Sequence, residues 1–389
     1  MVPMLAGPRL MAMGGGAVAE VPALLAKLGL CHPLVVTDAF MVSSGLLERM
    51  LAPLRAAGLT FAIFDGVVPD PTDTVVDAGV AALAGAPFDC LIGFGGGSPM
   101  DTAKAIAIAA ALPAGAHLRS VKAPAAADMA ALPVLCVPTT AGTGSEVTRF
   151  TIITDTARDE KMLIAGLGAL PLAAVVDYEL TMGLPRRITA DTGIDSLTHA
   201  LEAFVSRRAN PVSDDYARAA MRLIAPNLRA VWANPGDHAA REAMMRGATL
   251  AGLAFSNASV ALVHGMSRPI GAHFHVPHGM SNAMLLPAVT EFGLAAGQAR
   301  YAEAARVMGL AGPGSEDAAA AAALLAELRA WNRDLEVPTP AGFGIDPARW
   351  RDLLPTMAAQ ALASGSPGNN PRVPEAAEIV ALYEGLFGA

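Results

Sequence analysis

The sequence lacks the features of a nucleic-acid-binding or membrane protein. Its 389 residues include 27 Lys and Arg against 35 Asp and Glu, so no basic surface for nucleic acid is expected. Hydrophobic residues reach 53%, yet no stretch offers the roughly 20 uninterrupted apolar residues of a spanning helix. The sequence therefore predicts neither a nucleic-acid nor a membrane partner.

Cysteine is scarce as well, and the few residues present are scattered. Cys31, Cys90 and Cys136 each lie in or beside an apolar run, which predicts buried, reduced thiols rather than a disulfide framework. The first residues, Met1–Leu5, lack the charged start and long apolar run of a signal peptide. Together these absences predict a cytoplasmic protein.

The chain does contain enough apolar sequence for two domains, because a single core rarely grows to this length. In its first part, short apolar runs without polar alternation are typical of strands covered on both faces of a sheet. Such strands are expected at Leu34–Thr37, Phe61–Phe64, Cys90–Phe94, Val134–Val137 and Ala173–Val176. Helical patterns are found at Val18–Leu28, Thr74–Ala84 and Met100–Ala111. This alternation predicts an α/β fold with a doubly wound parallel sheet.

The pattern changes near Leu184. Beyond it no good strand run occurs, and long segments rich in Ala and Leu dominate, punctuated by Pro and Gly. The helical segments expected there are Gly193–Val205, Asp214–Leu228, Ala239–Phe255, Leu294–Val307 and Glu316–Leu328. We therefore predict an α/β domain over residues 1–183 and an all-helical domain over residues 184–389.

Two glycine-rich segments follow predicted strands. In Gly95–Lys104 consecutive glycines end a strand and a helix begins at once, with Ser98 as its expected cap and Pro99 in its first turn. Glycine lets backbone N–H groups approach a phosphate, and the N-terminus of a helix favours negative charge. The segment is equally compatible with a tight turn that binds nothing, since it is neither the usual dinucleotide fingerprint nor a P-loop.

The second segment, Val137–Thr148, is rich in Gly, Ser and Thr. Loops after neighbouring parallel strands meet at one edge of the sheet, where open α/β sheets bind ligands, although a solvated loop is the alternative. Asp38 ends another predicted strand. Its carboxylate could bind a ribose 2′-hydroxyl and would repel a 2′-phosphate, which favours NAD over NADP, although an Asp in this position is more often a turn former.

Asp195 and His199 lie four residues apart on a predicted helix, so their side chains share one face. Such a pair can bind one metal ion, but it is usually a solvated face or a helix-stabilising contact. Half of the eight histidines cluster further along the chain, at His264, His273, His275 and His278. Imidazoles with one carboxylate suit a borderline divalent ion such as Fe²⁺ or Zn²⁺, whereas His273 and His275 are more typical of hydrogen-bonded residues.

Taken together, these motifs resemble those of the iron-containing (group III) alcohol dehydrogenases. The matching segments are Ala6–Arg9, Gly95–Lys104, Pro138–Thr148, Thr192–His199, His264–Met266, Pro277–Gly279 and Asn370–Arg372. The resemblance covers essentially the whole chain. It implies a metal-dependent oxidoreductase that transfers a hydride between NAD(H) and a small alcohol or aldehyde, acting as a homodimer. Residues 1–183 would then bind the dinucleotide, and residues 184–389 would bind the metal.

The same resemblance assigns roles to individual residues. The implied metal ligands are Asp195, His199, His264 and His278, with Fe²⁺ as the expected ion and Zn²⁺ as the alternative. The implied or matching cofactor positions are Asp38, Asp70, Gly96, Gly97, Ser98, Thr139, Thr140, Thr143, Thr148 and Lys161. The implied substrate-channel residues are Phe150, Phe255 and Val260.

Two positions depart from the family pattern. Arg268 replaces a histidine thought to aid proton transfer, and arginine is a poor acid or base because it stays protonated. We therefore expect Arg268 to favour a substrate with an acidic group. The candidates for the proton path are His275, the cofactor ribose and water, and the predicted ligand His278 also counts among the expected catalytic residues. Asp70 replaces an asparagine that commonly contacts adenine.

A dehydroquinate-synthase-like lyase and a non-catalytic nucleotide-binding protein remain alternative interpretations.

Overall fold

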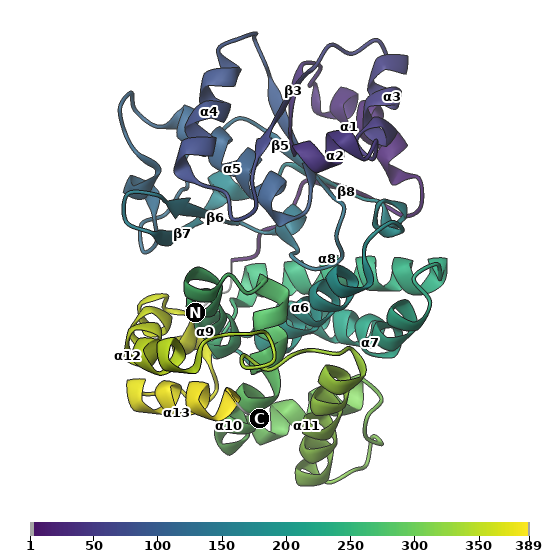
Figure 1. The fold of residues 1–389 in the computed structure, drawn as a ribbon. Helices are drawn as coiled ribbons and strands as arrows, with labels where there is room; N and C mark the ends of the chain where they lie inside the picture. Colours follow the sequence, from purple (N-terminus) through teal and green to yellow (C-terminus); the bar gives the residue numbers. More distant parts are fainter. Residues whose placement is uncertain (1–3, 388–389) are drawn as a thin grey trace. The chain divides into compact units, whose positions relative to one another are not determined.

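The computed structural model describes residues 4–387, which belong to two compact units. One unit comprises Met4–Gly183 and the other begins at Leu184 (Figure 1). The first contains a parallel sheet covered by helices, and the second is helical. The predicted fold class is therefore confirmed.

The first unit is built on a six-stranded parallel sheet with the order β1-β8-β5-β4-β2-β3. Its strands are β1 (Leu10–Met13), β2 (Pro33–Asp38), β3 (Ala62–Val67), β4 (Cys90–Gly95), β5 (Val134–Pro138) and β8 (Ala173–Val176). β4, β5 and β8 are buried along their whole length, as their apolar runs predict. The edge strand β1 escapes sequence-based prediction, because its four residues include no β-branched or aromatic side chain.

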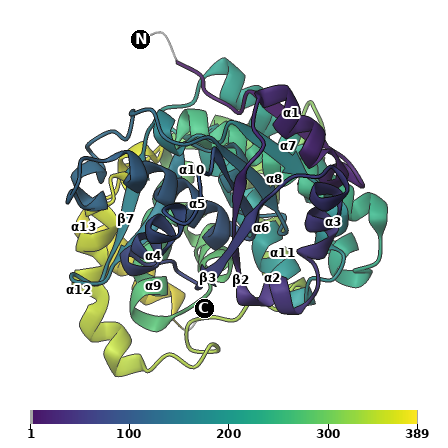
Figure 2. The ribbon, with the colours of Figure 1, turned by 90° about the horizontal axis from the view of Figure 1, so that it is seen from above.

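Helices cover both faces of this sheet, because successive residues of a strand point to opposite sides. Leu34 and Val36 of β2 pack in one core with Ile106, whereas Val35 between them packs in a second core with Leu25. The principal helices here are α1 (Val21–Leu28), α3 (Glu48–Ala56), α4 (Asp73–Leu83) and α5 (Gly97–Ala111). α4 and α5 lie side by side (Figures 1 and 2).

A separate antiparallel hairpin of β6 (Phe150–Asp155) and β7 (Glu160–Ala165) belongs to the same unit. Arg119 holds its turn end, donating from Nε to Asp155 Oδ2 at 2.7 Å and from Nη2 to Glu160 Oε2 at 2.9 Å. Burial opposes ionisation of Asp155, but Arg119 lowers its pKa overall, and Lys122 and Arg119 lower the pKa of Glu160. The hairpin therefore depends on charged carboxylates.

The part of the second unit that the structure describes contains no strand. Its helices are α6 (Arg186–Val205), α7 (Pro211–Ala233), α8 (His238–Ala258), α9 (Leu262–Phe274), α10 (His278–Val307), α11 (Asp317–Asp334), α12 (Pro347–Ala363) and α13 (Ala376–Leu386). The sequence pattern does not predict α9, α12 or α13. It also misses the start of α6, whose residues are buried on nearly every side, so that the apolar stripe of a surface helix is obscured.

Pro287 lies inside the first half of α10 and has no N–H to donate to the carbonyl of Ala283, whereas the kink of this helix is at Gly297. Asn332 of α11 supplies the missing bond, since its Nδ2 donates to Ala283 O at 2.8 Å. α11 therefore supports the first half of α10, which begins at His278.

All three cysteines are free; Cys90 and Cys136 are buried in strands, but Cys31 is exposed, contrary to prediction. Cys31 precedes β2, and its backbone N–H donates to Asp89 Oδ2 at 2.7 Å, which holds it at the surface.

Within residues 4–387, no single helix is long and apolar enough to cross a membrane, and only α8 and α9, bent by 105°, meet that test as a pair.

Candidate functional site

One helix, α6, carries two predicted metal ligands and a further carboxylate on the same side. Asp195, His199 and Glu202 follow one another at spacings of four and three residues, which places them on one face of an α-helix. All three are buried, because α6 packs against α8, α9 and α10. The helix therefore directs polar side chains into the interior of the unit, where they require partners.

α9 and α10 bring the other two predicted ligands to this face. His264 lies in the first turn of α9, with Nε2 3.5 Å from Asp195 Oδ1. His278 is the first residue of α10 rather than part of an isolated turn, and its Nε2 lies 3.8 Å from Asp195 Oδ1. The helix can begin there because Gly279 packs against the backbone of Asp191, where a Cβ atom would not fit.

The ligand atoms of the predicted metal site lie close to one another. Asp195, His199 and His264 each offer one atom, and these atoms lie within 4.8 Å of one another. The side chain of His278 is 42% exposed and lies at the border of this group. One carboxylate with neutral imidazoles is a donor set of borderline divalent ions. The residues present therefore fit such an ion.

The charges of Asp195 and of the histidines around it stabilise one another. Burial by itself would raise the pKa of Asp195, but the neighbouring His199, His278 and His264 lower it well below its usual range. Burial would lower the pKa of His264, but Glu202 and Asp195 raise it to about 8. The negative charges of Asp195 and Glu202 thus favour a positive charge between them, and a bound cation requires such a surrounding.

Asn282, which the sequence analysis does not single out, lies among the same atoms. Its Nδ2 donates to Asp195 Oδ1 at 2.7 Å and lies 3.2 Å from Nε2 of both His264 and His278. Its Oδ1 is buried and accepts no hydrogen bond from the described residues. Asn282 is one turn after His278 on α10, and this spacing is the only signal in the sequence that could have indicated it.

Phe255 covers one side of the cluster. Its ring stacks on that of His199, with centroids 4.2 Å apart and planes inclined by 17°. Val260 is buried in the same unit, where its carbonyl accepts a hydrogen bond from Asn369 Nδ2 at 3.0 Å. Phe150 belongs to the α/β unit, at the start of β6. Of the three predicted channel residues, the structure brings Phe255 into contact with a predicted metal ligand.

Arg268, predicted to bind an acidic group, lies on α9, and His275, the candidate for proton transfer, lies at its end. Arg268 donates from Nη1 to Ser366 Oγ at 3.2 Å, whereas its buried Nε has no hydrogen-bond partner among residues 4–387. His275 caps α9 in a left-handed conformation, with φ of 55°, and is exposed. His273 Nε2 lies 2.9 Å from Gln360 Oε1, which agrees with its interpretation as a hydrogen-bonded residue.

The two glycine-rich segments meet at the carboxyl ends of β4 and β5, which are neighbours in the sheet. Thr139 N donates to Gly95 O at 2.9 Å, and a Cβ atom on Gly97 would lie 3.0 Å from Thr143 Cγ2. Thr140 Oγ1 is buried and has no hydrogen-bond partner in the described part of the chain. An unpartnered hydroxyl beside the N-terminus of a long helix fits a phosphate group.

The start of α5 differs in detail from the prediction. The helix begins at Gly97 with Gly96 as its N-cap residue, so Ser98 lies inside the first turn and is not the cap. No side chain caps this end, because glycine occupies the N-cap position. The first N–H groups of α5 therefore have no side-chain partner at the cap, as an anion-binding turn requires.

Lys104 is a second residue whose importance the sequence does not reveal. Its buried Nζ donates to Ser145 Oγ at 2.8 Å, Phe150 O at 3.0 Å and Thr148 O at 3.1 Å. Ser145 Oγ in turn donates to Asp101 Oδ1 at 2.6 Å. Thr148, a predicted cofactor contact, is itself buried in this network. Lys104 thus ties α5 to the second glycine-rich segment.

The remaining predicted cofactor residues lie in two places on the α/β unit. Asp38 Oδ1 accepts from Met41 N at 3.0 Å and caps the short helix α2 (Ala39–Ser43), so it is a turn former whatever else it binds. Asp70 and Lys161 form an ion pair, with Oδ1 and Nζ 2.6 Å apart. A cofactor would therefore meet these two side chains as an ion pair and not as two independent groups.

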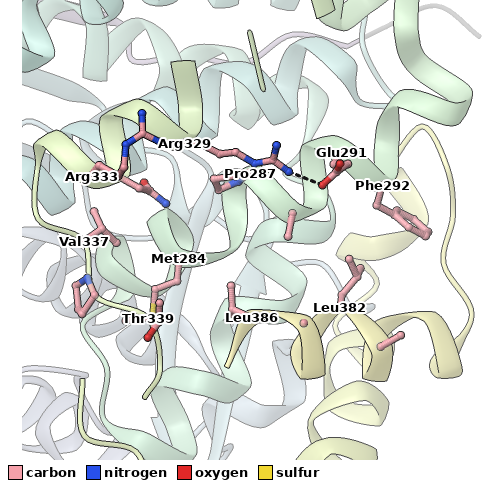
Figure 3. Close-up of a pocket in the computed structure, with 15 residues that line it drawn as sticks. Met284, Pro287, Glu291, Phe292, Arg329, Arg333, Val337, Thr339, Leu382 and Leu386 are labelled. Carbon is pink, nitrogen blue, oxygen red and sulfur yellow. Dashed lines mark hydrogen bonds and ion pairs between the residues drawn. The ribbon is translucent and has the colours of Figure 1, made fainter. Parts of the chain in front are cut away.

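A pocket of about 740 Å³ lies elsewhere in the helical unit, between α10, α11 and α13 (Figure 3). Met284 and Leu382 are among its apolar walls, and Arg329 pairs with Glu291 at 2.7 Å at its side. None of the predicted site residues lines it. This pocket is consequently distinct from the metal-ligand cluster.

Comparison with known proteins gave matches along both units. Family models described as "Iron-containing alcohol dehydrogenase" and "Fe-containing alcohol dehydrogenase family, C-terminal" match residues 8–178 and 189–387. Lactaldehyde reductase of Escherichia coli (strain K12) is 38% identical over 95% of this chain and 96% of its own. A solved 1,3-propanediol oxidoreductase superposes with a TM-score of 0.95 at 36% identity, over 100% of both chains. A sulfoacetaldehyde reductase of Bifidobacterium kashiwanohense, solved in complex with NAD⁺, superposes with a TM-score of 0.88 at 28% identity, over 100% of both chains.

Proposed function

Because the chain belongs to the iron-containing alcohol dehydrogenase family, and is therefore an oxidoreductase of alcohols and aldehydes, we propose that it transfers a hydride between NAD(H) and a small primary alcohol or aldehyde. The observation that carries this proposal is the convergence of Asp195, His199 and His264 in the buried interior of the helical unit. The proposed reaction needs such a site, since a divalent ion supplies the Lewis acidity that lowers the pKa of a substrate hydroxyl.

We propose Asp195, His199, His264 and His278 as the four residues that hold this ion. Fe²⁺ is our first choice because the family is named for iron, and Zn²⁺ is the alternative because the same donor atoms suit it. Phe255, stacked on His199, would exclude water from one side of the site. We propose that Val260 and Phe150 also line the substrate channel.

For the cofactor, we propose that Gly96, Gly97 and Ser98 at the start of α5 bind the phosphates. Thr139, Thr140, Thr143 and Thr148 would contribute from the adjoining segment, of which Thr140 has a buried unpartnered hydroxyl and Thr148 acts through the Lys104 network. Asp38 would bind the ribose and select NAD over NADP. Asp70 and Lys161 would contact the adenine end as a pair.

Arg268 supports a finer proposal about the substrate, namely that it carries an acidic group. Its Nη1 donates to Ser366 Oγ, and its Nε is buried and unpartnered among the described residues, which leaves donors for an anion. A sulfoacetaldehyde reductase is among the structural relatives. With arginine here, we propose that the exposed His275 passes the proton to solvent.

The substrate proposal is tested by comparing turnover of neutral and acidic aldehydes by the native protein and by Arg268→Ala. A loss of kcat/KM for the acidic aldehyde alone supports it, and equal losses for both contradict it.

For His275→Ala, a changed pH profile of kcat with unchanged metal content would support the proton path. An unaltered profile would exclude His275 from it.

The central experiment is metal analysis of anaerobically purified protein, followed by an aldehyde panel with NADH and with NADPH. We expect one bound ion per chain, oxidation of NADH in preference to NADPH, and loss of both metal and turnover in Asp195→Ala and His264→Ala. Intact metal content and activity in those variants would refute the site. A lyase related to dehydroquinate synthase, which the comparisons do not favour, would show no net oxidation of NADH.

We further propose that the protein is a cytoplasmic homodimer. All three cysteines are free, including the exposed Cys31, which suits a reducing compartment. β1 is an edge strand whose Met11 and Met13 side chains are 46% and 41% exposed, and such an edge is suited to pairing with a second copy. Light scattering tests the dimer, and cell fractionation tests the compartment.

A further inference from the structure

Glu202 is a buried carboxylate that takes part in neither the proposed ligand set nor any ion pair with lysine or arginine among residues 4–387. Its Oε1 accepts a hydrogen bond from Val263 N at 2.6 Å, and its Oε2 lies 2.6 Å from His264 Nδ1. An ionised carboxylate can only accept hydrogen bonds, so the short contact with the imidazole requires a proton on Nδ1. Glu202 thus determines where a neutral His264 carries its proton.

The other ring nitrogen of His264 has independent evidence for the opposite role. Nε2 lies 3.2 Å from Nδ2 of Asn282 and 3.5 Å from Oδ1 of Asp195. An amide nitrogen donates and does not accept, so a neutral His264 in this position accepts through the lone pair of Nε2. Asp195 Oδ1 attracts a proton on Nε2 only across 3.5 Å, whereas Glu202 contacts Nδ1 at 2.6 Å. The shorter contact therefore favours the Nδ1–H tautomer of the neutral ring, and Asn282 is compatible with it.

From this geometry we infer that Glu202 is a positioning residue for the metal: it holds His264 in the Nδ1–H tautomer and keeps Nε2 available as a ligand. The inference rests on the proposed metal site and deepens it. Carboxylate partners of metal-bound histidines act in this way, and their loss typically reduces metal affinity 10- to 100-fold. Glu202 is three residues after His199 on α6, so one helix supplies two ligands and the partner of a third.

A merely structural role is the competing explanation, because Glu202 also accepts from Val263 at the first turn of α9. Glu202→Gln separates the two roles. A glutamine has one carbonyl oxygen and an NH₂ group, so it cannot accept from both Val263 and His264. If its oxygen keeps the bond to Val263, its NH₂ faces Nδ1 and the proton of His264 moves to Nε2.

The experiment measures Zn²⁺ affinity by chelator competition, together with ¹⁵N NMR of the His264 ring in metal-free protein at a pH well above the pKa of about 8 of that ring, where it is neutral. For Glu202→Gln we expect about 10- to 100-fold weaker Zn²⁺ binding and a change from the Nδ1–H to the Nε2–H tautomer. Glu202→Asp, which keeps two acceptor oxygens, should retain the native tautomer. Glu242→Gln on α8 removes a negative charge that forms no ion pair among residues 4–387, and it should leave both measurements unchanged.

Unchanged Zn²⁺ affinity in Glu202→Gln overturns the inference. Weaker binding with an unchanged tautomer also overturns it, because loss of charge alone would then explain the effect. If Glu202→Gln does not fold, a double-mutant cycle of Glu202→Ala with His264→Ala decides: Glu202→Ala should weaken Zn²⁺ binding in the native background and have little further effect once His264 is removed. Native protein that binds no metal would instead refute the proposed function.

Discussion

Asn282 Nδ2 donates a hydrogen bond to Asp195 Oδ1 at 2.7 Å, in the interior of the helical unit. The same nitrogen lies 3.2 Å from Nε2 of His264 and of His278, so it is surrounded by atoms of three proposed metal ligands. In metal-free protein this amide partly compensates the charge of Asp195, the role that a cation would otherwise fill. The arrangement leads to a prediction about stability with and without metal.

We predict that Asn282→Ala lowers the free energy of unfolding of metal-free protein by about 1–3 kcal/mol, because a buried acceptor loses its donor. The loss should be smaller with Zn²⁺ bound, since the cation then compensates Asp195. Urea unfolding of both forms measures the difference. Asn227→Ala, which removes a bond from Nδ2 to Leu223 O at 2.8 Å on α7, should cost the same in both forms. Equal losses for Asn282→Ala would contradict the prediction.

A second prediction concerns the contact between Gly97 and Thr143. A Cβ atom at position 97 would lie 3.0 Å from Thr143 Cγ2, so Gly97→Ala should push the two glycine-rich segments apart and weaken NADH binding at least several-fold. Fluorescence titration with NADH provides the measurement, and metal content should not change. Gly97→Ala combined with Thr143→Ser, which lacks that methyl group, should regain part of the affinity. No regain would mean that the alanine acts on the cofactor directly.

Lys104 and Asp101 give a third prediction. Lys104→Met removes a buried ammonium and leaves Asp101 without its neighbouring positive charge, so we expect a loss of about 3–5 kcal/mol in unfolding free energy. Adding Asp101→Asn should recover part of that loss, because no unpaired charge then stays buried. Urea unfolding of the two single variants and the double variant tests this. Strictly additive losses would show that the two residues act independently.

The ion-pair group at the β6–β7 turn makes stability depend on acid. The pKa values of Asp155 and Glu160 are lowered from 3.8 and 4.5 in the folded chain, mainly by Arg119 and Lys122 acting against burial. A lowered folded pKa adds stability above the unfolded pKa, and that stability is lost as pH falls through the folded value. Arg119→Met should therefore destabilise the protein at neutral pH and less so near pH ~3. Thermal unfolding across this pH range would contradict this if the difference between variant and native protein stayed constant.

Much of the fold could be predicted because its signals are local. Apolar runs such as Cys90–Phe94 and the glycines that follow them indicate buried strands with a turn into a helix, and the structure contains both. Two other elements carried weaker signals: the edge strand β1 has no β-branched residue, and the helix α6 is buried on nearly every side, which obscures its apolar stripe. In such cases packing, rather than local pattern, decides the structure.

By itself the sequence determined the parallel sheet, the glycine-rich segments at its edge and the Asp195–His199 pair, because each depends on residues close together in the chain. Only the tertiary structure decided how distant side chains meet. Asn282 reaches Asp195 across 87 positions, Glu202 reaches His264 across 62, and Lys104 reaches Ser145 across 41. The physical reason is that hydrogen bonds in a buried site form between packed helices and segments, and spacing within one helix reveals only the face from which a side chain leaves.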